Sequence, residues 1–141
     1  MERKEFLHSS ALLLGWSVFL KSSHIEGFEI KNKFITPPYL KKGDTIGITC
    51  PSGYIMEVEI QPAIEKLKEW GFNVEIGETV GKIDGSFGGT DEQRMEDFQY
   101  MLNSDHIKAI LCARGGYGAI RIIDKIDFSN FRKQPKWIIG F

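Results

Sequence analysis

The strongest structural signal in this chain of 141 residues lies in the segment Ile107-Lys-Ala-Ile-Leu-Cys-Ala-Arg-Gly-Gly-Tyr-Gly-Ala-Ile-Arg-Ile-Ile-Asp124. It opens with an apolar run, Ile107 to Ala113, that only Lys108 interrupts. A run this short and this rich in isoleucine predicts a strand that is buried on both faces. After the glycines that follow, apolar residues return at Ile120, Ile122 and Ile123. This pattern predicts a helix that starts near Ala119 and packs back on the sheet.

The glycines at positions 115, 116 and 118 allow the backbone to turn sharply between the predicted strand and helix. Such a turn lies at the carboxyl edge of a parallel sheet, where open α/β sheets bind ligands and exposed amides favour anionic groups. The turn is not a dinucleotide fingerprint, because Arg121 stands where the third glycine is required, and it has no Walker Gly-Lys-Ser/Thr. Spacing alone therefore leaves two interpretations open: a ligand site, or a tight connection without a ligand.

Strand and helix patterns alternate along the chain from about residue 38. We expect strands at 44–50, 73–76, 107–113 and 137–141, helices at 56–70 and from Thr90 to Leu102, and a glycine-rich loop at 77–89. The first helix presents Ile60, Ala63, Ile64, Leu67 and Trp70 at helical spacing, and the second presents Met95, Phe98, Met101 and Leu102. Alternation of this kind predicts an α/β fold with a parallel, flavodoxin-like or Rossmann-like sheet.

Composition excludes several functional classes. The 18 Lys and Arg balance 19 Asp and Glu, so no basic face is indicated and nucleic acid is not an expected partner. Cys50 and Cys112 are the only cysteines, and both are expected to be buried free thiols. His8, His24 and His106 show no metal-ligand spacing. We expect neither a metal site nor a cofactor.

The first 37 residues differ from the rest of the chain. Residues 1–23 combine a charged start with the short apolar stretch 11–20, which is too short to span a bilayer but has the plan of a secretory leader. This favours export to the periplasm, and the alternative is an amphipathic helix retained in a cytoplasmic protein. Residues 24–37 read as a polar linker, and Pro37-Pro38 marks the start of the folded domain, 38–141.

Four blocks of the folded part resemble the LD-carboxypeptidases, serine peptidase family S66, which includes the microcin-immunity peptidases. The blocks are Leu40 to Ile48 with Pro51-Ser52, Phe87 to Arg94, Ala113 to Gly118 with Arg121 to Asp124, and Lys136 to Phe141. The resemblance covers 38–141 and implies an N-terminal α/β domain that stops before the family's C-terminal domain.

The resemblance also implies a chemistry. The family removes terminal D-alanine from the murein tetrapeptide with a Ser-Glu-His triad. Its serine directly follows the Gly-Phe pair that corresponds to Gly140-Phe141, and its glutamate and histidine lie in the C-terminal domain. We therefore expect no triad residue within this chain. The candidate residues for oxyanion and substrate binding are Gly115, Gly116, Tyr117 and Ser52.

Two functional hypotheses follow. In the first, the chain is the N-terminal part of an LD-carboxypeptidase that acts on a murein peptide, is inactive alone and forms a homodimer at full length. In the second, it is a non-catalytic module that binds a peptide or an anionic ligand at Gly115–Gly118.

Overall fold

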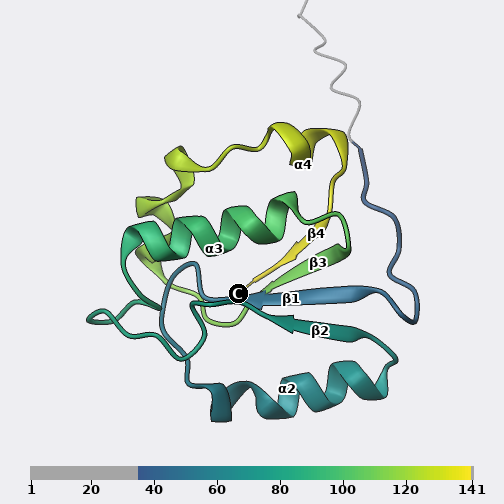
Figure 1. Cartoon of the computed structure of the whole chain (residues 1–141), viewed down its shortest axis with the longest axis horizontal. Helices are drawn as coiled ribbons and strands as arrows, with labels where there is room; N and C mark the ends of the chain where they lie inside the picture. Colours follow the sequence, from purple (N-terminus) through teal and green to yellow (C-terminus); the bar gives the residue numbers. More distant parts are fainter. Residues whose placement is uncertain (1–34, 141) are drawn as a thin grey trace, which may run out of the picture. The chain divides into compact units, whose positions relative to one another are not determined.

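The computed structural model describes residues 35–140, which form a parallel sheet with helices on both faces (Figure 1). The elements are β1 (Thr45–Thr49), α2 (Glu57–Glu69), β2 (Asn73–Ile76), α3 (Asp91–Asn103), β3 (Ile107–Cys112), the 3₁₀ helices η2 (Tyr117–Arg121) and η3 (Ile123–Lys125), α4 (Ser129–Lys133) and β4 (Trp137–Ile139). The strand order is β2-β1-β3-β4, and all three pairings are parallel. This is the flavodoxin-like order, and it confirms the predicted α/β fold. Residues 1–23, most of 24–37 and Phe141 lie outside the described residues, so the leader and linker stay predictions.

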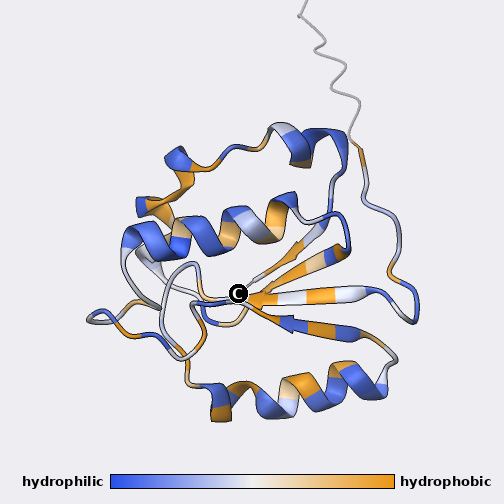
Figure 2. Cartoon of the chain, in the orientation of Figure 1, coloured by the Kyte–Doolittle hydropathy of each residue, from blue (hydrophilic) through white to orange (hydrophobic). Residues whose placement is uncertain are grey.

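Each face of the sheet has its own hydrophobic core. On the face covered by α3, the buried residues are Phe98, Met101, Leu102, Ile107, Ile110 and Ile126, with Met95, Phe128 and Phe131 packed against them. On the face covered by α2, the buried residues are Ile48, Cys50, Ile60, Ile64 and Val80. Figure 2 shows that β3 and β4 are largely hydrophobic, whereas β2, at the edge, alternates. The predicted apolar face of α3 is thus confirmed.

The apolar face of α2 is narrower than predicted. Ile60 and Ile64 are buried, but Ala63 and Trp70 are exposed. Trp70 is the C-cap of the helix, just beyond its last turn, and α2 covers only the part of the sheet beside an edge strand. One stripe of the helix is enough to cover so small an area, so the remaining apolar positions face solvent.

The predicted helix from about Ala119 is wrong. Two short 3₁₀ helices, η2 and η3, take its place. Ile122 is buried as expected, but Ile120 and Ile123 are exposed. The segment therefore covers the sheet with single side chains and not with a continuous helical face.

Hydrogen bonds from distant residues explain this difference. The Gly118 N–H donates to Ser52 Oγ (2.9 Å), and the Gly118 carbonyl accepts from the Arg94 guanidinium (2.9 Å). The Ile122 N–H donates to the Ala119 carbonyl (3.1 Å), which is a 3₁₀ bond. Side chains thus hold both polar groups of Gly118, and the Ile122 N–H is used by the 3₁₀ bond to Ala119 and not by an α-helical bond to the Gly118 carbonyl.

The prediction of two buried free thiols holds in part. Cys50 is buried and free, and burial raises the pKa of its thiol to about 11, whereas Cys112 is free but only partly buried. His106 lies at the surface beside Glu75 (2.7 Å), while His8 and His24 fall outside the described residues. Between residues 35 and 140, no helix combines the length and the apolar content needed to cross a bilayer.

Candidate functional site

The sheet topology brings the loops after β1 and β3 together. The chain leaves β1 for β2 on one side of the sheet and returns later to β3 on the other side. The carboxyl ends of β1 and β3 therefore flank a topological switch point, where sheets of this type bind ligands. A cavity of about 280 Å³ lies there, and its lining includes Ser52, Gly115, Gly116 and Tyr117. The structure thus brings all four candidate residues to one place.

Gly116 has a backbone that favours glycine. Its φ is +136° and its ψ is 175°, a region that other residues essentially do not occupy. A Cβ added at this position would lie 2.9 Å from Ser52 Oγ. Within residues 35–140, the N–H groups of Gly115 and Gly116 donate to no protein acceptor. Two main-chain donors at the cavity are therefore available to an anionic atom of a ligand.

Ser52 lies beneath the turn. Ser52 is only 3% exposed. Its hydroxyl oxygen accepts a hydrogen bond from the Gly118 N–H, and its carbonyl accepts one from the Gly88 N–H (3.0 Å). These bonds join the loop after β1 to the glycine turn and to the loop before α3. The geometry gives Ser52 a supporting position, and its role in substrate contact stays a prediction.

Arg94 is the central residue of the site that the sequence analysis missed. It is completely buried, and one guanidinium nitrogen donates both to the Pro51 carbonyl (2.6 Å) and to the Gly118 carbonyl (2.9 Å). Its Nε donates to the Gly89 carbonyl (3.2 Å). A single side chain thus links three loops at the carboxyl edge. The signal was visible as a charged residue at helical spacing with Phe98 on an apolar face.

Aromatic and charged side chains build the outer wall of the site. The guanidinium carbons of Arg94 and Arg121 lie 4.8 Å and 5.1 Å from the centre of the Phe87 ring. Tyr117 packs edge-on against the same ring, with 5.3 Å between centroids. Asp91 contacts both arginines, and the hydrogen bond from Arg121 holds the pKa of its carboxyl below the usual value. These contacts fix the position of Phe87 and Tyr117 beside the glycine turn.

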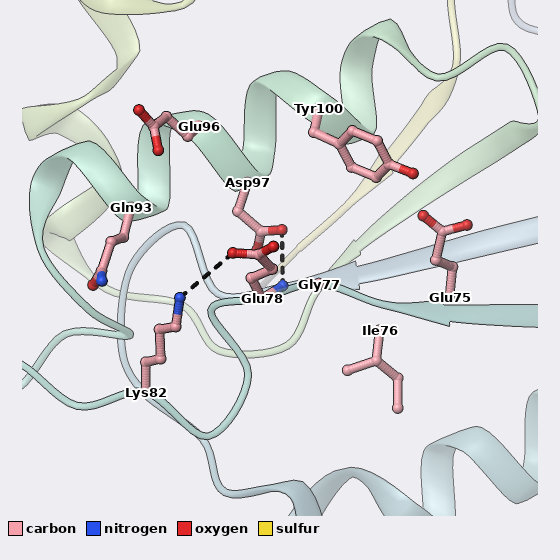
Figure 3. A pocket seen from close by; sticks show the side chains of 9 residues that line it. All are labelled: Glu75, Ile76, Gly77, Glu78, Lys82, Gln93, Glu96, Asp97 and Tyr100. Carbon is pink, nitrogen blue, oxygen red and sulfur yellow. Dashed lines mark hydrogen bonds and ion pairs between the residues drawn. The ribbon is translucent and has the colours of Figure 1, made fainter.

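A second cavity lies beside β2 and α3 (Figure 3). Its Asp97 is buried and accepts hydrogen bonds from Thr49 Oγ1 (2.6 Å) and the Glu78 N–H (3.0 Å). Sequence reasoning missed this carboxylate as well. Because Thr49 is the last residue of β1, the bonds tie the carboxyl end of β1 to α3. Between residues 35 and 140, no group of three His, Cys, Asp or Glu side chains is placed to hold a metal ion.

The site can be compared with known proteins. The sequence pattern of the LD-carboxypeptidase N-terminal domain, Peptidase_S66, matches residues 46–141. The chain is 38% identical over 105 residues to a probable murein peptide carboxypeptidase of Bacillus subtilis (strain 168), an alignment that covers 74% of this chain and 33% of the relative.

Solved structures of MccF and of an MccF-like protein have a similar fold. The fold matches an MccF-like protein from Bacillus anthracis with a TM-score of 0.70 at 30% identity, covering 77% of this chain and 34% of that one. It matches the microcin C7 self-immunity protein MccF, in a mutant form in complex with adenosine monophosphate, with a TM-score of 0.71 at 26% identity, covering 77% and 33%. The chain therefore spans about a third of the length of the relatives it matches.

Proposed function

The chain belongs to the LD-carboxypeptidase family, peptidase family S66, and we propose that it forms the N-terminal domain of a serine-type murein peptide carboxypeptidase. The main observation behind this proposal is the glycine turn, which lies at the switch point of the sheet. Within residues 35–140, the N–H groups of Gly115 and Gly116 donate to no acceptor. The name of the Bacillus subtilis relative supports a murein peptide as substrate. The family pattern supports removal of a terminal D-amino acid.

In this proposal the glycine turn binds the oxyanion. A serine hydroxyl attacks the carbonyl of the terminal peptide bond, a base takes the hydroxyl proton, and the carbonyl oxygen becomes negative. Donors that already point at this oxygen stabilise it without reorganisation. The Gly116 N–H is such a donor, because Ser52 and Arg94 hold the neighbouring Gly118 from both sides. The intermediate then collapses, the D-amino acid leaves with a proton on its nitrogen, and water hydrolyses the ester.

The serine, glutamate and histidine of the triad are assigned to the family positions beyond Gly140-Phe141. Such a division predicts that residues 1–141 alone do not hydrolyse the peptide, because an oxyanion donor cannot replace an activated nucleophile. A non-catalytic binding module is the second candidate. It is favoured by one observation: the cavity at the turn is lined by Gly115 and Gly116, whose N–H groups donate to no acceptor within residues 35–140 and could bind an anionic group without any reaction.

A chimera separates the two candidates. Residues 46–141 replace the matching segment of the Bacillus subtilis relative, and mass spectrometry follows loss of D-alanine from the murein tetrapeptide. We expect release by the folded chimera and none by the 141-residue chain. Release of D-alanine by the 141-residue chain alone would contradict the assignment of the triad to positions beyond Gly140-Phe141. A folded but inactive chimera beside an active parent enzyme would favour the binding module.

We also propose export to the periplasm, on the basis of the charged and apolar pattern of residues 1–23, and a homodimer at full length. A fusion of residues 1–37 to a reporter that is active only after export tests the first proposal. Sedimentation of the full-length protein tests the second. A reporter that stays inactive, or a monomer at all concentrations, would contradict the respective proposal.

A further inference from the structure

We propose that the guanidinium of Arg114 binds the C-terminal carboxylate of the peptide in the cavity at the glycine turn. This inference rests on the proposed function and names the residue that selects a free chain end. Arg114 is the first residue after the apolar run of β3 and Ala113, and it lines the cavity together with Gly115 and Gly116.

Three arginines lie at this edge of the sheet, and within residues 35–140 only the side chain of Arg114 makes no hydrogen bond. Arg94 is completely buried and all three of its guanidinium nitrogens bond to protein oxygens. Arg121 bonds to Asp91 through Nε (3.0 Å) and through a terminal nitrogen (3.0 Å). Within residues 35–140, the Arg114 side chain makes no hydrogen bond, and its guanidinium has five N–H donors.

The stem of Arg114 is nevertheless held in place. A Cβ added at Gly53 would lie 3.2 Å from Arg114 Cγ, so the aliphatic part of the arginine packs where Gly53 has no side chain. The side chain is 52% exposed, and within residues 35–140 the carboxylate paired with it is that of Glu59, at 3.9 Å. That separation is longer than a hydrogen bond. The other oxygen of Glu59 accepts from the Met56 N–H (2.8 Å), which fixes the carboxylate at the start of α2. Glu59 thus attracts the guanidinium without occupying its donors.

The chemistry of the substrate fits these donors. A carboxypeptidase cuts the last peptide bond, and the feature that marks this bond is the free carboxylate beside it. A planar guanidinium can bind a carboxylate through two parallel hydrogen bonds, which fixes orientation as well as charge. Among the described residues that line the cavity, Arg114 is the one cation. A carboxylate bound there lies in the same cavity as the Gly116 N–H, and its peptide carbonyl is brought toward the oxyanion donors.

The test compares two peptides on one chain. The murein tetrapeptide with a free D-alanine carboxylate, and the same peptide as its C-terminal amide, are titrated into the 141-residue chain while the Gly53 and Gly116 amide signals are followed by NMR. We expect the acid to bind about tenfold more tightly than the amide. Arg114→Gln should abolish this preference, so that acid and amide bind alike, whereas Arg114→Lys should keep part of it, because a lysine is a point charge without the planar fork of donors. Lys125→Gln removes the same charge from an exposed residue outside the cavity and should change nothing.

The outcomes separate this inference from the proposed function. Equal binding of acid and amide by the wild-type chain, or a preference that survives Arg114→Gln, would overturn the role of Arg114 and leave the murein peptide as ligand. A wild-type chain that bound neither peptide would overturn the role of Arg114 as the carboxylate site of this domain, and the chimera would then decide the proposed function separately. Thermal melts of the variants should match the wild type, because the Arg114 side chain is half exposed and has no hydrogen bond within the described residues.

Discussion

Arg94 sets the position of the site, and its value to the fold can be measured. Lysine at this position keeps the charge but cannot reach the Pro51, Gly89 and Gly118 carbonyls with one planar group. We expect Arg94→Lys to lower the free energy of unfolding by about 3 kcal/mol, since buried acceptors lose their donors. Arg132→Lys is the matched control at an exposed position and should change it by less than about 0.5 kcal/mol. Urea unfolding measures both variants, and equal midpoints would show that Arg94 does not hold the loops.

Gly116 gives a second test at the residue scale. Gly116→Ala places a methyl group 2.9 Å from Ser52 Oγ on a backbone that favours glycine, and we expect a loss of about 2 kcal/mol. Gly85→Ala is the control, because Gly85 also has positive φ (+59°) but has open space around it. It should lose about 1 kcal/mol.

The same pair of variants tests the oxyanion role. In the active chimera, kcat of Gly116→Ala should fall by about 100-fold in protein that remains folded, while Gly85→Ala keeps the parental kcat. An unchanged kcat in folded Gly116→Ala would leave the turn as a structural connection only.

Asp91 predicts a pH dependence. The hydrogen bond from Arg121 lowers the pKa of Asp91 below its ordinary 3.8, so the unfolded chain binds the proton first as the pH falls. The stabilisation is therefore complete above the unfolded pKa and is lost as the pH falls through the folded pKa. In unfolding measurements from about pH 5 to about pH 2, the difference between wild type and Asp91→Asn should shrink toward acid. Arg121→Gln should remove the same pH-dependent part, and parallel curves for wild type and Asp91→Asn would refute the assignment.

At the scale of elements, the sequence predicted the features that depend on residues close together in the chain. The strand predicted at 73–76 and the helix predicted to start at Thr90 are confirmed, because strand pairing patterns and the bonds between the Thr90 and Gln93 side chains and main chain act over a few residues. The segment after Ala119 was read incorrectly, because Ser52 and Arg94 control it from more than 20 residues away. The four candidate residues, predicted from motifs, lie together at one cavity, and their role in binding stays a prediction, whereas Arg94 acts through contacts that one-dimensional spacing does not contain.

Helix α2 contains a proline whose replacement should stabilise the protein. Pro62 lies inside the helix on its exposed side, where it cannot donate a hydrogen bond to the carbonyl of Val58. Proline also restricts the unfolded chain, which offsets part of this cost. We expect Pro62→Ala to raise the free energy of unfolding by about 1 kcal/mol. Gln61→Ala, at the neighbouring exposed position, should have a smaller effect, and a destabilised Pro62→Ala would show that the proline is needed where it stands.

At the scale of the molecule, β4 presents an edge that invites association. Among the described residues it pairs with β3 alone, and Ile138 and Ile139 are 41% and 44% exposed. Unpaired main-chain groups beside exposed isoleucines can pair with another chain. We therefore expect a chain that begins at Pro38 to self-associate in light scattering as its concentration rises.

Two variants that introduce a charge at different positions test whether this association occurs through β4. Ile139→Lys places a charge on the edge strand and should return the chain to a monomer. Ile83→Lys places the same charge on an exposed isoleucine of the loop between β2 and α3, and should leave association unchanged. If both variants dissociate, general hydrophobicity drives association, and if neither does, the contact lies elsewhere. Only dissociation by Ile139→Lys alone assigns the contact to the edge of the sheet that β4 forms.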